Sequence, residues 1–176
     1  MTKNSILMCM KSIKNILPAF VYGGSDGAVT TFSVMAGAAG AGLDPKIIII
    51  LGCANLASDG FSMASADYLS EESKAKPDGK KSFLQAVVTF FAFSLVGLVP
   101  LVPFLLALFV TLPANNFLLS TVFTLIAFIA IGSLRGYILK KNKLEMILQS
   151  VGIGTLCAVV AYLVGQAIAQ AIGNTP

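Results

Sequence analysis

Five long apolar runs, separated by short polar segments, follow one another along the chain. A helix needs about 20 apolar residues to cross the ~30 Å hydrocarbon core of a bilayer, and each run is long enough. The pattern predicts membrane-spanning helices at roughly 17–41, 45–70, 82–110, 116–138 and 144–172. Pro45 should open the second helix, and Pro100 and Pro103 should kink the third. We therefore predict an all-α membrane protein that forms a single transmembrane domain.

The composition supports this interpretation. Of the 176 residues, 56% are hydrophobic and only 11% are charged, and the mean hydropathy is +0.86. Soluble domains carry roughly 25% charged residues. The three cysteines are widely spaced and the chain has no histidine, so the sequence indicates neither a disulfide framework nor a zinc site.

Basic residues gather on one side of the predicted hairpins. They precede the first helix, fill the loop at 71–81 and follow the fourth helix: Lys3, Lys11 and Lys14; Lys74, Lys76, Lys80 and Lys81; Arg135, Lys140, Lys141 and Lys143. The opposite side has only Lys46. The positive-inside rule then places the N-terminus in the cytoplasm and the C-terminus outside. We expect a multi-pass protein of a bacterial inner membrane or an organelle membrane, and no binding to nucleic acid.

Two acidic residues, Asp26 and Asp59, lie inside predicted spans. A charge near the bilayer centre costs at least about 2.5–3.5 kcal/mol on insertion scales, so such residues are functional-site candidates. At 100° per residue, Asp59 shares a face of the second helix with Asn55 and Met63. Asp26 shares a stripe of the first helix with Tyr22, Thr30 and Ser33. Polar groups that face lipid have no hydrogen-bond partner there, so the two stripes should face each other or a partner protein.

These side chains predict a metal site. Asp26, Asp59 and Asn55 offer oxygen ligands, and the thioether of Met63 favours a transition metal over Mg²⁺ or Ca²⁺. Without histidine, Asp26 and Asp59 are also the natural proton carriers. They would be protonated when the site is empty and ionised when metal binds.

Two further features bear on a pathway. Asp67 and Glu71 are i, i+4 neighbours at the end of the second helix, where they could collect cations at the cytosolic mouth. Gly23 and Gly27 form a small-xxx-small pair. This pair predicts close helix packing, and around Asp26 it would let two copies of the first helix meet with their carboxylates close together in a dimer seam.

The segments "YGGSDGAVTTFSVMAGAAGAG" (22–42) and "GCANLASDGFSMASADYLSEES" (52–73) resemble the vacuolar iron transporter family of Fe²⁺/Mn²⁺ transporters. The likeness continues through "GLVPLVPFLLA", "GSLRGYI" and "GIGTLCAVVAYLVGQ". It implies a five-helix protomer, a homodimer with a metal pathway between the helix pairs, and proton-coupled export of divalent metal from the cytosol. The family's intramembrane aspartate falls on Asp26, and its helix-two methionine falls on Met63.

This chain departs from the family pattern in two places. Many members have a glutamate where this chain has Asn55, and a small residue where it has Asp59, as if the acid had moved by one turn on the same face. The short loop at 71–81 replaces a Glu-rich cytosolic metal-binding domain. A loading step that depends on that domain is therefore not carried over, and the choice between Fe²⁺ and Mn²⁺ stays open.

Two other functions fit parts of the pattern. An intramembrane aspartyl protease also needs two buried aspartates, but its usual G-x-G-D reads G-G-S-D here, and Asp59 follows Ser58 instead of a tyrosine. A structural or assembly protein would tolerate neutralisation of Asp26 and Asp59. We expect a transporter, not an enzyme, with no cofactor. Its partners would be the metal substrate, protons, the bilayer and a second copy of the chain.

Overall fold

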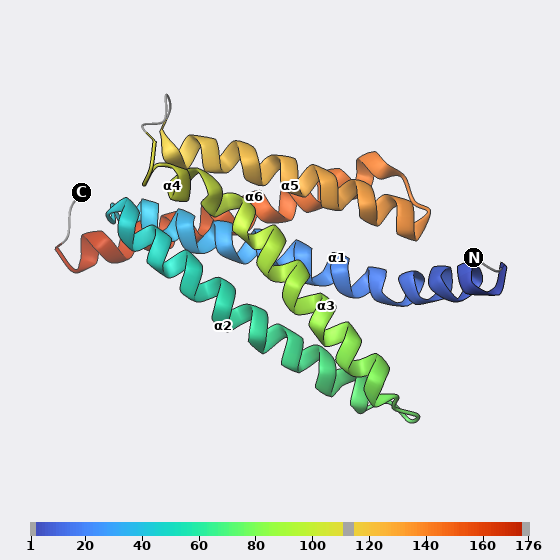
Figure 1. Ribbon diagram of the computed structural model, residues 1–176. Coiled ribbons are helices and arrows are strands. Elements are labelled where there is room, and N and C mark those ends of the chain that lie inside the picture. Colours follow the sequence, from blue (N-terminus) through green and yellow to red (C-terminus); the bar gives the residue numbers. More distant parts are fainter. Residues whose placement is uncertain (1–2, 111–114, 174–176) are drawn as a thin grey trace.

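The structure is a computed structural model that describes residues 3–110 and 115–173, with side chains from residue 16 onward. Its elements are α1 (Lys3–Gly40), α2 (Pro45–Glu72), α3 (Gly79–Leu98), the 3-10 turn η1 (Val99–Leu101), α4 (Val102–Leu106), α5 (Asn116–Leu139) and α6 (Lys143–Ala171). These ranges contain helices and no strand (Figure 1). The prediction of an all-α membrane protein is confirmed.

Within the described residues, four helical segments are long and apolar enough to cross a membrane: α2, the α3–α4 segment Gly79–Leu106, α5 and α6. The sequence analysis expected five, but α1 does not reach the same mean hydropathy. Glycines, hydroxyl side chains and Asp26 replace aliphatic residues along it. The span through α1 therefore stays a prediction.

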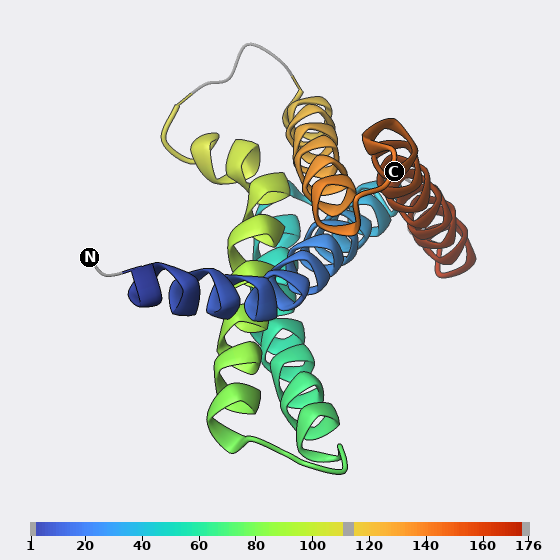
Figure 2. The ribbon, with the colours of Figure 1, turned by 90° about the vertical axis from the view of Figure 1, so that its right-hand side faces the viewer.

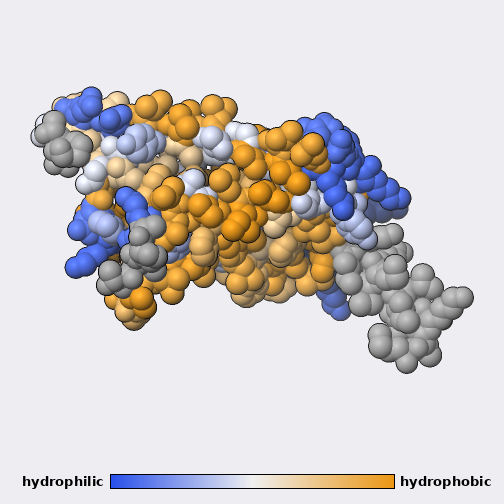
Figure 3. Space-filling view, turned by 90° about the horizontal axis from the view of Figure 1, so that it is seen from above, coloured by the Kyte–Doolittle hydropathy of each residue, from blue (hydrophilic) through white to orange (hydrophobic). Residues whose placement is uncertain are grey.

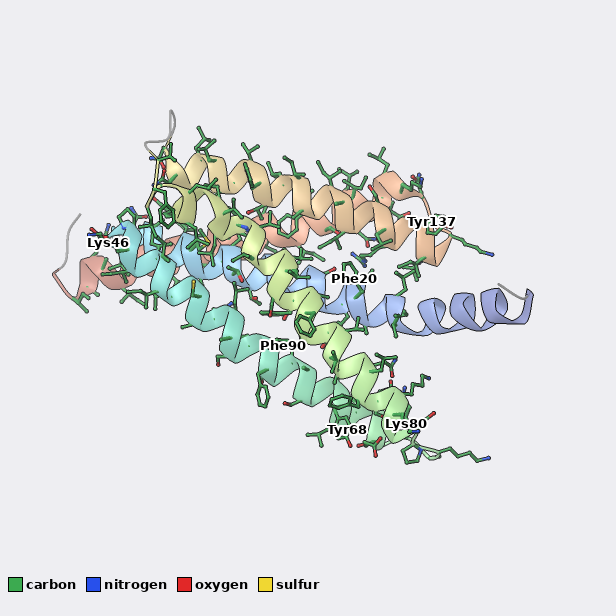
Figure 4. The ribbon with its side chains drawn as sticks, viewed as in Figure 1. Phe20, Lys46, Tyr68, Lys80, Phe90 and Tyr137 are labelled. Atoms are coloured by element: carbon green, nitrogen blue, oxygen red, sulfur yellow. The ribbon has the colours of Figure 1, made fainter. Side chains whose placement is uncertain are left out.

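The surface matches a protein embedded in lipid. Apolar side chains cover the middle of the molecule, and hydrophilic ones gather at its two ends (Figure 3). The α2–α3 and α5–α6 turns lie at one end, and the α1–α2 turn lies at the other (Figure 1). Lys80 marks the first end and Lys46 the second (Figure 4).

Helix α1 is the centre of the fold. It packs most extensively on α3 along one side and on α6 along another, with smaller contacts to α2 and α5. Helix α2 packs mainly on α3. Together α2 and α3 form an arm that diverges from α1, α5 and α6 toward the α2–α3 turn (Figures 1 and 2).

Four helices begin at a side-chain cap. Asp44 Oδ1 accepts a hydrogen bond from the Lys46 amide at 2.7 Å, and Asp78, Asn115 and Asn142 cap α3, α5 and α6 in the same way. Each cap satisfies one of the amides that a helix start leaves without an intrahelical partner. These caps explain why α2, α5 and α6 begin at or within one residue of the predicted positions.

Other predicted boundaries were wrong. Helix α1 begins at Lys3, not near residue 17, and runs through Pro18 without ending; the lysines before residue 17 conceal the helix from an argument based on apolar runs. Helix α2 continues to Glu72, so the predicted loop at 71–81 shrinks to 73–78. The third run breaks into α3, η1 and α4, which confirms the kink at its two prolines.

Candidate functional site

The polar stripe of α1 lies at the surface of the protomer. Tyr22 is 59% exposed, and Asp26, Thr30 and Ser33 are half-buried. The Thr30 hydroxyl donates to the backbone oxygen of Asp26 at 2.9 Å, so it is satisfied within its own helix. The Asp26 carboxylate therefore lies on a face that the other helices of the chain cover only in part.

Gly23 and Gly27 lie on the neighbouring face of α1, where they pack on α3. A Cβ at Gly23 would collide with the backbone oxygen of Thr89, and one at Gly27 with that of Phe93. The pair therefore serves helix packing within one protomer, as small-xxx-small pairs commonly do. The predicted helix-packing role of these glycines is confirmed, but α3 occupies the face at which two copies of the first helix were expected to meet.

Helix α2 brings Asp59 and Asn55 to α1. Asp59 lies one turn after Asn55 on the same face of α2, within range of electrostatic interaction with Asp26 of α1. The Asn55 side-chain amide Nδ2 donates to Thr31 Oγ1 at 3.4 Å, near the upper limit for a hydrogen bond. Thr31 is fully buried and is one residue away from the predicted stripe, so the sequence analysis missed it. Two carboxylates, an amide and a hydroxyl thus gather where α1 meets α2.

Met63 is half-buried and packs against an apolar cluster that includes Met35, Leu56 and Phe93. Its thioether therefore has a packing role, and its predicted role as a metal ligand stays a prediction. Among the residues that the structure describes, no group of three or more His, Cys, Asp or Glu side chains could hold a metal ion. One protomer offers two close carboxylates, which are too few for an all-carboxylate site.

The predicted cytosolic mouth already has partners inside the chain. The Thr89 hydroxyl donates to Asp67 Oδ2 at 2.6 Å, and Thr89 is fully buried, so this bond joins α2 to α3. Glu71 forms an ion pair with Lys74. Such an exposed pair contributes little stability and leaves Glu71 able to exchange its partner. Asp67 lies two helical turns beyond Asp59, about 12 Å along α2.

Arg135 was grouped with the basic residues of the loop after the fourth helix, although the predicted helix 116–138 contains it. That grouping was wrong, because Arg135 lies inside α5 and is half-buried. Its Nη1 donates to Ser150 Oγ of α6 at 3.2 Å, and Ser150 is only 8% exposed. The signal for it was available in the apolar residues that flank "SLRGY", since a basic residue inside a span is a functional candidate.

Comparison with known proteins agrees with the resemblance seen in the sequence. The chain matches the sequence model of the VIT family over residues 17–81 and 75–166. It is 22% identical over 218 residues to vacuolar iron transporter 1 of Eucalyptus grandis, which covers 87% of this chain and 86% of that protein. It is 42% identical over 52 residues to the vacuolar iron transporter of Toxoplasma gondii, and 35% identical over 57 residues to that of Plasmodium berghei. These two matches cover 30% and 32% of this chain, but only 17% and 21% of the relatives.

Proposed function

Because the chain belongs to the VIT family, we propose that it transports a divalent transition metal, Fe²⁺ or Mn²⁺, out of the cytosol. The observation that carries the proposal is the pair of half-buried carboxylates, Asp26 and Asp59, which lie where α1 meets α2 and within range of electrostatic interaction with each other. Two like charges beside each other in an apolar protein are costly unless a cation or protons neutralise them. A transported metal ion supplies that neutralisation.

The proposed pathway lies between two copies of the chain. A face with an exposed Tyr22 and a half-buried Asp26 would leave polar groups in lipid, where they have no hydrogen-bond partner. If a second copy of the chain packs on this face, the polar groups of the face are no longer exposed to lipid. The two copies together would supply four carboxylates and two amides, enough oxygen ligands for a divalent ion. The proposed seam is thus the α1 stripe with the adjoining face of α2, not the Gly23–Gly27 face.

Transport is proposed to be coupled to protons. Carboxylates must be ionised to bind metal, so binding releases protons and weakens as pH falls. In a chain without histidine, Asp26 and Asp59 are the groups on the proposed path that can accept and release those protons. Metal that leaves the cytosol would then exchange for protons that enter it. Asn55, held by Thr31, keeps its amide oxygen available as a neutral ligand.

Uptake into proteoliposomes tests the function. The native protein should quench an internal metal-sensitive dye after Mn²⁺ or Fe²⁺ is added outside, and Asp26→Asn should lower the rate to that of protein-free liposomes. An amide at this position can still form hydrogen bonds but carries no charge for the ion. Glu145→Gln is the matched control, because Glu145 is an exposed acid in the first turn of α6. A folded Asp26→Asn protein with native uptake would refute the proposal and favour a structural role.

A further inference from the structure

A groove of about 580 Å³ lies between α1, α5 and α6. Its polar groups are those of Arg135, Asp26, Ser25 and Tyr22, and apolar side chains such as Ile138 form the rest of its wall. No residue of α2 lines it. The groove lies on the α5–α6 side of the α1 stripe and the proposed seam between two copies lies on its α2 side, so Tyr22 and Asp26 border both.

Arg135 has hydrogen-bonding capacity to spare in this groove. Its guanidinium carries five N–H donors, and one of them is used on Ser150. Among the side chains that the structure describes, no carboxylate lies within ion-pair distance of it. The Ser25 Oγ is also buried and has no hydrogen-bond partner among the residues that the structure describes. A half-buried cation and an unsatisfied hydroxyl thus line the same groove.

The groove extends to the basic end of the molecule. Leu139, the last residue of α5, belongs to its wall, and the turn that follows carries exposed Lys140, Lys141 and Lys143. Ile131, one turn deeper on α5 than Arg135, packs beside Gly24 of α1. Arg135 therefore lies on the α5–α6 turn side of that contact. The nearby acidic residues are Asp26 in the groove and Glu145 on the surface, so basic residues outnumber acidic ones near the turn.

We propose that this groove binds an anionic phospholipid. The lipid phosphate accepts hydrogen bonds from the free donors of Arg135, and the three lysines of the turn attract its negative charge. An acyl chain lies along the part of the wall on the bilayer side of Arg135, which includes Val29, Ile153 and Cys157. The positive-inside rule predicts that this end is cytosolic, where the leaflet is rich in anionic lipid. The apolar wall favours a lipid over a free phosphate ion.

Lipid binding to the purified full-length protein tests this site without any transport assay. Delipidated protein in neutral detergent would be titrated with short-chain phosphatidylglycerol, phosphatidylcholine or glycerol phosphate, with native mass spectrometry and thermal unfolding as readouts. Phosphatidylglycerol should bind at least about tenfold more tightly than phosphatidylcholine, because both carry the phosphate but only phosphatidylglycerol has a net negative charge for Arg135 and the lysines to attract. Glycerol phosphate should bind much more weakly, because it has no chain to fill the groove.

Two variants separate binding from folding. Arg135→Gln should abolish the preference for phosphatidylglycerol. Val21→Trp should abolish it as well by filling the groove from α1, while Arg135 and Ser150 stay intact. The control is Lys76→Gln, which removes an exposed charge from the α2–α3 turn and should keep the preference. Equal binding of the two lipids by the native protein, a preference that survives either groove variant, or equally tight binding of glycerol phosphate would overturn the lipid assignment.

Discussion

The contact of α1 with α3 and the contact of α1 with α2 differ in extent and in chemistry. Toward α3, the glycines of α1 let the two backbones touch over a long seam. Toward α2, the seam is shorter, and a hydrogen bond of 3.4 Å and a pair of repelling carboxylates belong to it. The first contact is built for stability. The second contact positions the charged groups of the proposed site but contributes less to packing. Substitutions in the α1–α3 contact should therefore lower stability, and substitutions in the α1–α2 contact should mainly change function.

The largest effect is expected at Gly27. In Gly27→Leu, the side chain meets the backbone of Phe93, which cannot move aside as a flexible side chain would. Unfolding should become easier by about 3 kcal/mol or more, seen as a large fall in the midpoint of thermal unfolding in detergent. Gly152→Leu is the matched control, because nothing lies within 4 Å of a Cβ at that position. Equal midpoints for the two variants would show that the seam is not close-packed.

A smaller loss is expected in the arm formed by α2 and α3. Thr89→Val keeps the shape of the side chain but removes the donor to Asp67, which leaves a part-buried carboxylate without its partner. The cost should be about 1–3 kcal/mol, measured as the shift in the denaturant or thermal midpoint. Thr155→Val, at an exposed position of α6, should change the midpoint much less. If both variants unfold alike, the Thr89–Asp67 bond does not hold the arm together.

The polar seam should respond in function more than in stability. Asp59→Asn removes one of two repelling charges, so the folded protein should be no less stable. Its metal affinity, measured by titration with Mn²⁺ between about pH 5 and pH 8, should depend less steeply on pH, because one fewer proton competes with the metal. Native protein should bind more weakly as pH falls. An unchanged slope in Asp59→Asn would exclude Asp59 from proton coupling.

The smallest effect overall is expected at Met63. Met63→Leu conserves volume in the cluster that Met63 contacts, so it should cost less than about 1.5 kcal/mol. Discrimination against Mg²⁺ and Ca²⁺ should fall, because the thioether is the soft donor of the proposed site. Competition of these ions with Mn²⁺ uptake is the measurement. The same competition in Met63→Leu as in native protein would leave Met63 with a packing role alone.

These contrasts show what the sequence could and could not predict. The starts of α2, α5 and α6 and the break at Pro100 were accessible, because each depends on local chemistry. The partner of Gly23 and Gly27 was not, since a pair of small residues indicates a close approach but not which helix approaches. Arg135 was grouped with the loop because lysines follow it closely, although the predicted helix 116–138 already contained it. Thr31 was missed because a regular 100° repeat does not show where α2 crosses α1.

The central claim is that metal and protons move in opposite directions through Asp26 and Asp59. The most direct test is to follow both at once, in proteoliposomes that contain a pH-sensitive dye and a metal-sensitive dye. With no imposed pH gradient, Mn²⁺ added outside should enter while the interior becomes more alkaline, and both signals should vanish in Asp26→Asn. Mn²⁺ that enters the native proteoliposomes without any change of internal pH would contradict the account and identify a facilitative carrier.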